Sequence, residues 1–583
     1  MKSKFSQIAL VLLAVLLLSG CAGLKKMGKN ADQIRFKVTP EVLETHGGKV
    51  DVAIIGMLPP KFFNKKATMV TTPVLKYAGG ETSLPSMNLQ GEKISGNDKE
   101  INYNAGGNFN YKQSIAYTDA MRMSELVMKT QIKQGKKKLE LEPVPVAKGV
   151  LSTSTLMAVT PRPILGIRRD NNNTGKYDPS IDPYQRIVPE EMIADISYLI
   201  NSADLRKDEK KASDVQEFID YTRKAGSDSK KEVKKVEITA YASPDGSLDL
   251  NTDLASKREQ TSSAFVEDAL KKNEVLNKLR ARYTPEDWDG FKQLMESSKI
   301  QDKDLILRVL SMYTDPEVRE REIKNLSSTF KQIADEILPK LRRAKLLTSV
   351  NLIGKTDEEI VGIADANPSS LNQAELLYAA TLTTDEVKKL KIYNSFSQQF
   401  PTDWRGPNNA GTILAQQYKY AEAKPYFEKA EKLKANEPIV KNNLGTIALI
   451  ENDLKKAEEY FSAAAGSGSE VNYNLGLVQI RKGNYNMANQ YFGSIEDINT
   501  ALVKILSGNY NGALRDLEDS DQSGSDMKEY LKAIIGARTN NDKLFFESLG
   551  KAVKINSGQK AKAKTDMEFA KYFDNADFKA LIK

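Results

Sequence analysis

Residues 236–258, VEITAYASPDGSLDLNTDLASKR, decide how the central part of this chain folds. Apolar and polar residues alternate from Val236 to Tyr241, which is the pattern of a half-buried strand. Residues 244–247 then supply turn residues, Pro-Asp-Gly-Ser. Beyond the turn, apolar residues recur at helical spacing, with Asp249 or Asn251 as the expected N-cap. The sequence therefore predicts a strand, a loop and a helix in immediate succession.

The helix carries the pattern Asn251-x-x-Leu254-Ala255-x-x-Arg258, and the loop 242–247 precedes it. The pattern resembles the NxxLSxxR motif of OmpA-like peptidoglycan-binding domains, and the loop occupies the place of their TDxxGS loop. In that family the two elements hold the carboxylate and ammonium ends of diaminopimelate in the wall peptide. A guanidinium suits a carboxylate because it offers two parallel N–H donors, and a helix start adds partial positive charge. The resemblance assigns the peptidoglycan site to Arg258, Asn251, Asp245 and Ser243.

Two positions depart from the family pattern. Ser243 stands where the family has the aspartate that pairs with the ammonium group, and Glu259 stands where a small residue follows the arginine. Asp245 replaces the missing carboxylate if the loop is re-aimed. The alternative interpretation is that Arg258 pairs with a neighbour such as Glu259 or Asp253 on a solvated helix face, as surface arginines usually do.

Residues 1–20 have the features of a signal peptide. Two lysines precede an apolar run, residues 8–18, that is too short to span a bilayer. Leu18-Ser19-Gly20-Cys21 resembles the lipobox of bacterial lipoproteins, which implies that Cys21 becomes an N-terminus acylated with diacylglycerol and palmitate. Several acyl chains hold a protein on a membrane for practical purposes permanently. A plain secretory signal with an incidental cysteine is the alternative.

The residues that follow Cys21 indicate the destination. Ala22, rather than an aspartate, favours sorting to the outer membrane. The linker, residues 21–30, lacks the acidic cluster that marks surface-exported Bacteroidetes lipoproteins. We therefore expect a lipid anchor in the inner leaflet of the outer membrane, with the protein facing the periplasm.

Composition argues against several classes of function. The chain has 85 Lys and Arg against 77 Asp and Glu, and its lysine clusters lack interleaved aromatic residues, so no nucleic acid is expected as a partner. Cys21 is the only cysteine, so no disulfide forms within the chain. His46, in an expected hairpin turn, is the only histidine. A Ser-His-Asp triad would have to use it, and a histidine zinc cluster is impossible. We expect neither an enzyme nor a cofactor.

Residues 31–186 have a β pattern. Short β-branched or alternating segments, such as 50–55 and 67–75, are separated by turn signals, and the pattern continues to 156–159. This predicts an all-β immunoglobulin-like sandwich region with one or two modules. Residues 170–181 have part of the spacing of a calcium loop, but the twelfth position is an isoleucine instead of the bidentate glutamate. We therefore expect an ordinary polar loop and no metal there.

Residues 187–355 are expected to form the OmpA-like domain, an α+β fold. Residues 192–201 are its expected first strand, and 342–352, which begin with an arginine pair, its last. A helical insertion at about 274–338 resembles a variant of the family found in Bacteroidetes lipoproteins. Trp288 within it is expected to pack in a core rather than to stack on a ligand.

A helical linker, residues 356–400, leads to a repeat region, residues 401–583. Glycine, alanine and phenylalanine recur there at fixed spacing in three triplets: Gly411, Ala423 and Phe427; Gly445, Ala457 and Phe461; Gly476, Ala488 and Phe492. The pattern resembles the tetratricopeptide repeat, whose helix pairs stack into an α-solenoid with a concave face for an extended peptide or partner protein. Asn409, Asn443 and Asn474 lie near the glycines. They either line this groove and bond a peptide backbone or bond neighbouring loops.

The sequence as a whole predicts a multidomain chain. We expect a non-catalytic outer-membrane lipoprotein that binds peptidoglycan through the OmpA-like domain and recruits unknown envelope proteins through the repeats, and so tethers or scaffolds an envelope complex. The alternative is a subunit of an outer-membrane assembly, secretion or fimbrial machine whose OmpA-like domain no longer binds the cell wall. Ser243, in place of an aspartate, favours that alternative.

Overall fold

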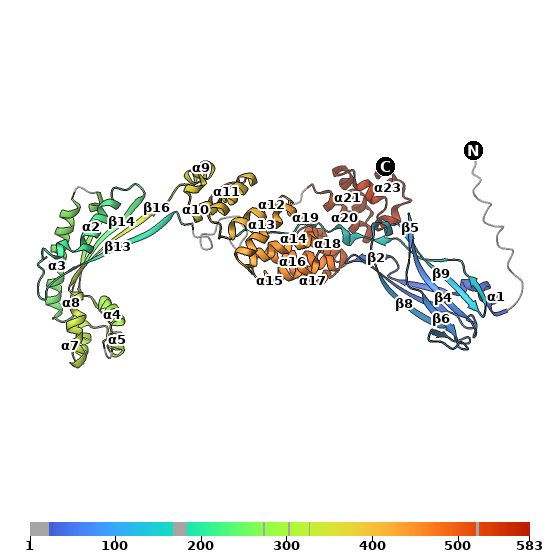
Figure 1. Ribbon diagram of the computed structural model, residues 1–583, viewed down its shortest axis with the longest axis horizontal. Helices are drawn as coiled ribbons and strands as arrows, with labels where there is room; N and C mark the ends of the chain where they lie inside the picture. Colours follow the sequence, from blue (N-terminus) through green and yellow to red (C-terminus); the bar gives the residue numbers. More distant parts are fainter. Residues whose placement is uncertain (1–21, 167–183, 272–273, 301–302, 326, 521–523) are drawn as a thin grey trace. The chain divides into compact units, whose positions relative to one another are not determined.

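The computed structural model describes residues 22–166, 184–271, 274–300, 303–325, 327–520 and 524–583 (Figure 1). The chain divides into two compact units, one formed by residues 1–166 and 400–583 and the other by residues 167–399. The expected signal peptide, Cys21 and the polar loop 170–181 lie outside the described residues. Within the described ranges, no helix combines the length and apolar character needed to cross a membrane.

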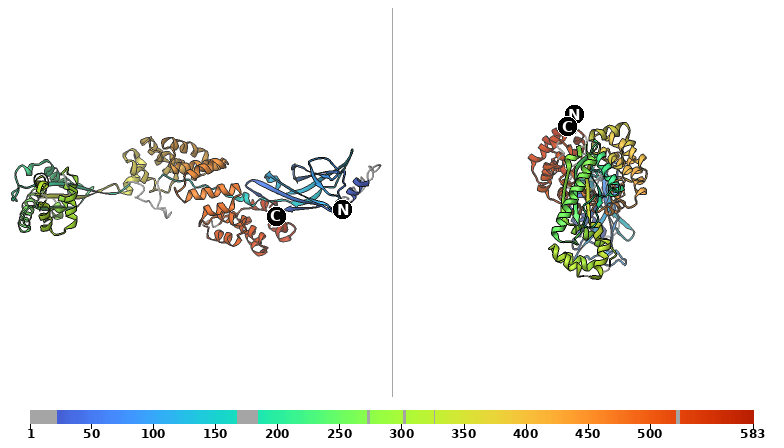
Figure 2. Two further views of the ribbon diagram at one scale, coloured as in Figure 1. Left: turned by 90° about the horizontal axis from the view of Figure 1, so that it is seen from below. Right: turned by 90° about the vertical axis from the view of Figure 1, so that its left-hand side faces the viewer.

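The first unit begins with a β-rich region made of two sheets, drawn in blue and cyan in Figure 2. One sheet has the strand order β1-β3-β2-β12, with β8 also paired to β3, and the other has the order β10-β9-β4-β6-β7, with β11 on β9 and β5 on β4. The strands are β1 (Arg35–Thr39), β2 (Leu43–His46), β3 (Lys49–Leu58), β4 (Thr68–Tyr77), β5 (Gly80–Ser83), β6 (Met87–Gly91), β7 (Lys99–Ile101), β8 (Gly107–Ala116), β9 (Ser124–Gln134), β10 (Lys137–Glu140), β11 (Val144–Lys148) and β12 (Val150–Leu151).

Alternation along the strands explains how the two sheets share a core. In β3, buried side chains such as Val52 and Ile54 alternate with more exposed ones, and they join one hydrophobic cluster with Met69 of β4 and Leu126 of β9. Burial of apolar surface at about 25 cal/mol per Å² makes this face the main source of the region's stability. The expected linker is instead helix α1 (Ala22–Lys29), because its apolar side chains pack into the same core.

The predicted β pattern ends earlier than expected. Residues 156–159 form no strand: Leu156 closes the 3-10 helix η3 (Thr153–Leu156), and the residues after it, as far as Gly166, have no strand partner. Leu156, Met157 and Ile164 belong to the hydrophobic cluster of the C-terminal helices rather than to that of the sheets. The pattern misled because an extended segment has the same alternation whether it pairs in a sheet or lies against helices.

The remainder of the first unit is a stack of helix pairs. Each helix of a pair packs on its partner and on the next pair, so the core continues from one pair to another. The helices are α12 (Arg405–Gln416), α13 (Tyr420–Leu433), α14 (Pro438–Ile450), α15 (Leu454–Ala463), α16 (Ser469–Lys482), α17 (Tyr485–Phe492), α18 (Ile498–Leu506), α19 (Tyr510–Asp519), α20 (Asp526–Arg538), α21 (Asp542–Ile555), α22 (Gln559–Ala563), η7 (Met567–Tyr572) and α23 (Ala576–Leu581).

The repeated glycines lie where two helices of a pair are closest. A Cβ added at Gly411 would lie 2.8 Å from a ring carbon of Phe427, and one added at Gly445 would lie 2.6 Å from the ring of Phe461. At Gly476 the corresponding distance, to Phe492, is 2.4 Å. Ala423, Ala457 and Ala488 are fully buried. These positions therefore serve the packing of helix on helix.

The second unit has a four-stranded sheet with helices. The strand order is β13-β16-β14-β15, and α2 and α3 bury their apolar side chains against the sheet. The elements are β13 (Ile187–Ser197), α2 (Ser213–Ala225), β14 (Lys231–Ala242), α3 (Leu248–Leu270), β15 (Leu279–Glu286), α4 (Trp288–Ser297), α5 (Lys303–Met312), α6 (Pro316–Lys324), α7 (Ser327–Glu336), α8 (Leu338–Leu341), β16 (Arg343–Ile353), α9 (Asp357–Ala366), α10 (Gln373–Ala379) and α11 (Glu386–Gln399), with the 3-10 helices η4 (Glu209–Lys211), η5 (Glu274–Lys278) and η6 (Pro368–Ser370).

Two predictions for this unit need correction. The first strand, β13, runs from Ile187 to Ser197 rather than over 192–201, because it pairs with β16 along its whole length. Residues 279–286, expected within the helical insertion, form the edge strand β15, parallel to β14. Its side chains are mostly exposed, so the strand lacks the apolar alternation by which strands are found.

The helices α4 to α8 have a small core of their own. Phe291, Met295 and Ile306 are buried in it. Trp288 packs edge-on against Phe291, and its Nε1 donates to Glu286 Oε2 at 2.8 Å. The indole is thus a packing group with one hydrogen bond, as a half-buried tryptophan usually is.

Candidate functional site

The loop between β14 and α3 brings the four predicted wall-binding residues together. Ser247 caps α3, since its side chain accepts a hydrogen bond from the backbone N–H of Leu250; neither Asp249 nor Asn251 is the cap. The loop and the first turns of α3 enclose a pocket of about 200 Å³. Its walls are formed by Ile200, Asn201, Ala242, Ser243, Asp245, Gly246, Leu250, Asn251, Leu254 and Arg258.

Arg258 is buried at the base of this pocket, with 1% of its surface exposed. Its Nε donates to the carbonyl of Ser202 at 3.0 Å, Nη1 to that of Tyr241 at 2.8 Å and Nη2 to that of Leu199 at 3.0 Å. The guanidinium centre lies 5.2 Å from the centre of the Tyr198 ring. Burial lowers the pKa of Arg258 to about 10, so the group remains charged at neutral pH.

The expected alternative partners of Arg258 are engaged elsewhere. Asp253 pairs with Lys257 at 2.7 Å, and Glu259 accepts a hydrogen bond from Ser263. The interpretation of Arg258 as a surface arginine on a solvated face is therefore wrong. Three carbonyls accept hydrogen bonds from three of the five N–H groups that a guanidinium offers.

Asp245 faces the same pocket and is held from two sides. Ser243 Oγ donates to one carboxylate oxygen, and Arg342 Nη2 lies 3.1 Å from the other. Arg342 Nε also donates to Ser243 Oγ at 3.1 Å. Ser243 therefore brings no charge of its own but orients the carboxylate two residues on. Beside the pocket, two guanidinium groups, of Arg258 and Arg342, face one carboxylate.

Asn251 ties the pocket to the helical cluster. Its Nδ2 donates to the carbonyl of Gly246 at 3.0 Å and to Glu286 Oε1 at 2.8 Å. Glu286 accepts in turn from Trp288. Asn251 thus fixes the loop and also lines the pocket. Sequence reasoning missed Glu286 in this role and noted Arg342 only as part of an arginine pair before the last strand.

The first helices of the repeat pairs form a second candidate site, and it is occupied by the chain itself. Residues 158–166, AVTPRPILG, lie along the first helices of successive pairs, and we refer to them as the strap. Asn499, Asn474 and Asn443 each exchange two hydrogen bonds with the backbone of one strap residue: Ala158 at 2.9 and 3.0 Å, Arg162 at 2.7 and 2.9 Å, and Ile164 at 2.7 and 2.7 Å.

We refer to Asn499, Asn474 and Asn443 as the asparagine ladder, and further side chains add to it. Asn442 Nδ2 donates to the carbonyl of Arg162 at 3.0 Å, and Asn409 Oδ1 accepts from the N–H of Gly166 at 2.5 Å. The carbonyl of Ile164 also accepts from Asn408 and Thr412. The expected asparagines therefore do bond an extended backbone, and that backbone belongs to the same chain.

Two strap side chains make specific contacts. The Arg162 guanidinium lies 3.7 Å from the centre of the Tyr473 ring, and its Nη2 is 3.3 Å from Asp497 Oδ2. Burial raises the pKa of Tyr473 to about 12, which keeps its hydroxyl protonated as a donor or acceptor beside Thr160. Ile164 is buried among the apolar side chains of the repeats.

A missed member of the ladder, Asn499, had a signal in the sequence. Asn409, Asn443 and Asn474 each stand two residues before the repeat glycine, and Asn499 stands two residues before Ala501, which occupies the glycine position of the next pair. Because Ala501 replaces the glycine by which the repeats were aligned, Asn499 was not recognised as the equivalent of the other three asparagines.

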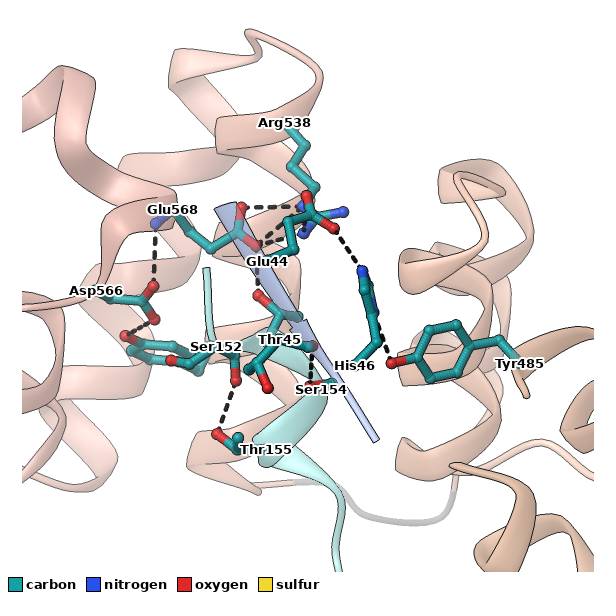
Figure 3. Close-up of polar contacts among 12 residues, drawn as sticks. Glu44, Thr45, His46, Ser152, Ser154, Thr155, Tyr485, Arg538, Asp566 and Glu568 are labelled. Carbon is teal, nitrogen blue, oxygen red and sulfur yellow. Dashed lines mark hydrogen bonds and ion pairs between the residues drawn. The ribbon is translucent and has the colours of Figure 1, made fainter. Parts of the chain in front are cut away.

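A partly buried polar cluster joins the β-rich region to the last repeats (Figure 3). Arg538 donates to Glu568 through Nε and Nη2, the latter at 2.6 Å, and Thr153 donates to the same carboxylate. His46 is exposed and ends β2 at the hairpin turn, as the sequence predicts. Its Nδ1 lies 2.8 Å from the Tyr485 hydroxyl and its Nε2 lies 3.2 Å from Glu44.

Electrostatic contacts in this cluster shift the pKa of Glu44. The hydrogen bond from His46 is the largest effect and lowers that pKa, and the charge of Arg538, 3.8 Å away, lowers it further against the opposing effect of burial. The cluster thus connects β2 to α17, α20 and η7 through hydrogen bonds and ion pairs.

Comparisons with known proteins bear on the helical part of the chain. Residues 408–437 match the family model described as Tetratricopeptide repeat. Similar solved structures include YrrB, described as a TPR protein with an unusual peptide-binding site, with 18% identity over 28% of this chain and 92% of that chain and a TM-score of 0.24.

Two further solved structures are similar at the same level. One is pilF of Pseudomonas aeruginosa, with 14% identity over 36% of this chain and 100% of that chain and a TM-score of 0.28. The other is the APC/C hetero-tetramer Cut9-Hcn1, with 15% identity over 58% of this chain and 75% of that chain and a TM-score of 0.27. No curated protein sequence matches. The family match and the stacked helix pairs together assign the C-terminal helices to a tetratricopeptide repeat region.

Proposed function

We propose that this chain is a non-catalytic lipoprotein of the outer membrane that faces the periplasm, binds peptidoglycan through an OmpA-like domain and recruits envelope proteins through its repeats. In this proposal Cys21 carries the lipid and residues 187–355 are the OmpA-like domain. The protein works as a tether and scaffold.

The observation that carries the wall-binding part is the composition of the pocket at the start of α3. A diaminopimelate end group is a zwitterion, with a carboxylate and an ammonium group. Arg258 supplies positive charge at the pocket for the carboxylate, and Asp245 supplies an oriented carboxylate for the ammonium group. Arg342 leaves the site with one excess positive charge, which suits a peptide rich in carboxylates.

Anchoring makes weak binding sufficient. A lipid on Cys21 would confine the domain near the cell wall, so that the second binding event becomes intramolecular at an effective concentration of about millimolar. A pocket of about 200 Å³ that holds only one end group therefore supports a persistent tether.

Co-sedimentation with purified diaminopimelate-containing sacculi tests this proposal. We expect the soluble mature chain with Cys21→Ser to pellet, and Asp245→Ala to lower its affinity about tenfold or more, since one charge-assisted contact is worth about 1.5–3 kcal/mol. Arg258→Ala should also lower the affinity, but it removes the donors to three carbonyls and can unfold the loop. Arg258→Lys is therefore tested beside it, because it keeps the positive charge. Asp253→Ala is the matched control, because this carboxylate lies on the exposed face of α3 and pairs with Lys257. This variant should pellet like the parent.

A second candidate function rests on the same geometry. Asp245 is already paired with Arg342, and Arg258 already binds three carbonyls, as in a site that has become structural. In that case the chain is a subunit of an envelope assembly, secretion or fimbrial machine that uses the domain only for protein contact. A parent chain that stays in solution with sacculi, or an Asp245→Ala variant that pellets like the parent, selects this second function.

A further inference from the structure

The asparagine ladder contacts the strap almost entirely through its backbone. Asn499, Asn474 and Asn443 each pair with both the N–H and the C=O of one residue, so the groove selects an extended chain and tolerates different side chains. These three asparagines are at most 1% exposed, and a buried amide needs such partners. The site is therefore built for an extended peptide.

The strap is held by hydrogen bonds and side-chain contacts in the groove and not by regular secondary structure. No strand or helix includes any of residues 158–166. Seven of the nine are only half-buried, and Pro161 and Ile164 are the two that are buried. Release of the strap would thus break side-chain contacts in the groove but no helix and no sheet. An asparagine side chain is also left over at one end, since Asn409 Nδ2 has no acceptor among the described residues.

Side-chain contacts define which peptides fit. Arg162 is read by the Tyr473 ring and Asp497, and two positions later Ile164 fills an apolar site. Pro161 and Pro163 stand between the residues whose N–H groups the ladder accepts, so their lack of an N–H costs nothing here. The fitting ligand is an extended segment with arginine, any residue or proline, and then a branched aliphatic residue.

We propose that the strap is a ligand in cis of a peptide-binding groove, and that a partner protein enters this groove with an extended Arg-x-aliphatic segment by displacing residues 158–166. The inference rests on the proposed role of the repeats in recruiting proteins and specifies the partner and the autoinhibition. A tethered strap competes at an effective concentration of about millimolar, so the intact chain resists weak or unspecific peptides.

The direct test is binding of a fluorescent peptide with the sequence of residues 156–166, LMAVTPRPILG, to the full mature chain. The double variant Arg162→Glu, Ile164→Asp weakens the strap without altering the groove. We expect this variant to bind the peptide at least tenfold more tightly than the parent does. Adding Asn443→Ala should abolish that binding, whereas Asn489→Ala, on the exposed face of α17, should leave it unchanged.

A second measurement needs no strap variant. Hydrogen exchange of the parent chain should show protected amides at Arg162 and Ile164, and excess peptide should remove that protection as the strap leaves. Full protection at peptide concentrations above about the millimolar effective concentration of the strap would overturn the proposal and make the strap a permanent structural element.

Two other outcomes also overturn the proposal. A folded strap variant that binds no peptide means that the groove is not a ligand site, and a parent that binds as tightly as the variant means that the strap does not block it. These assays contain no sacculi. A chain that binds the peptide but not sacculi therefore contradicts the wall-binding proposal alone. A chain that binds sacculi but not the peptide contradicts the groove proposal alone.

Discussion

The buried pair of Arg538 and Glu568 offers the sharpest test of what joins the β-rich region to the repeats. The Glu568 side chain is 3% exposed and that of Arg538 is 15% exposed, so both charges are largely removed from water. Arg538→Met keeps the length of the side chain but takes away the donors at Nε and Nη2. Thr153 is then the remaining side-chain donor to the carboxylate among the described residues.

The expected cost follows from the uncompensated charge. Breaking a buried ion pair by removing one partner typically costs about 3–5 kcal/mol, because the other charge stays buried, whereas replacing both partners by apolar groups is often close to neutral. We therefore expect Arg538→Met to destabilise the first unit by about 3–5 kcal/mol. The double variant Arg538→Met, Glu568→Leu should recover at least about 2 kcal/mol of that loss.

Tryptophan fluorescence reads this effect from one unit alone. The chain has two tryptophans, Trp288 in the second unit and Trp404 in the first. In a Trp288→Phe background, denaturant unfolding followed by Trp404 reports the unit that contains the cluster. A single-variant cost below about 1 kcal/mol would refute the reasoning. So would a double variant less stable than Arg538→Met, since that result means that the carboxylate does not suffer from losing its partner.

Three further predictions use fluorescence-detected unfolding, two of them through Trp404 in the Trp288→Phe background and one through Trp288 in the parent background. Glu44→Gln should lower the free energy of unfolding at pH 7 but change it little in acid. The folded pKa of Glu44 lies below its ordinary value of 4.5, so the carboxylate stabilises the fold above that value and loses this contribution as pH falls through the folded pKa. A stability difference between parent and variant that persists at the lowest pH would contradict this. Gly445→Ala should cost about 1–3 kcal/mol, because its Cβ would lie 2.6 Å from the Phe461 ring. Gly362→Ala, in the open on α9 and read through Trp288, should instead stabilise its unit by up to about 1 kcal/mol.

Local patterns placed the four predicted wall-binding residues of the second unit in one pocket because these residues are close in sequence. Ser243, Asp245, Asn251 and Arg258 lie within one loop and the helix after it, and the strand, turn and helix signals placed them together. The rest of the site comes from main-chain carbonyls and from Arg342, which have no local signature. A carbonyl acceptor is present at every residue, so no sequence pattern shows that three of them converge on one guanidinium.

The strap was unpredictable for a different reason. Its partners are far away in sequence: Asn443 bonds Ile164, 279 residues earlier, and Asn474 bonds Arg162, 312 residues earlier. The asparagines were visible as a repeat feature, whereas the identity of the backbone that they bind depends on the return of the chain to the groove. Periodicity identifies a groove, but not its occupant.

The prolines of the strap explain why this occupant does not become a strand in one of the sheets. A central strand needs an N–H on both edges, and Pro161 and Pro163 remove the donors from one edge. The other edge, with the N–H groups of Arg162 and Ile164, is satisfied by side-chain amides of Asn474 and Asn443. On one edge of the strap, the N–H groups of Arg162 and Ile164 are bound by the asparagine ladder. On the other edge, Pro161 and Pro163 have no N–H to offer a neighbouring strand. This arrangement protects an otherwise open edge from unwanted pairing with other chains, and it leaves the groove as the stable location of the segment without committing it to a sheet.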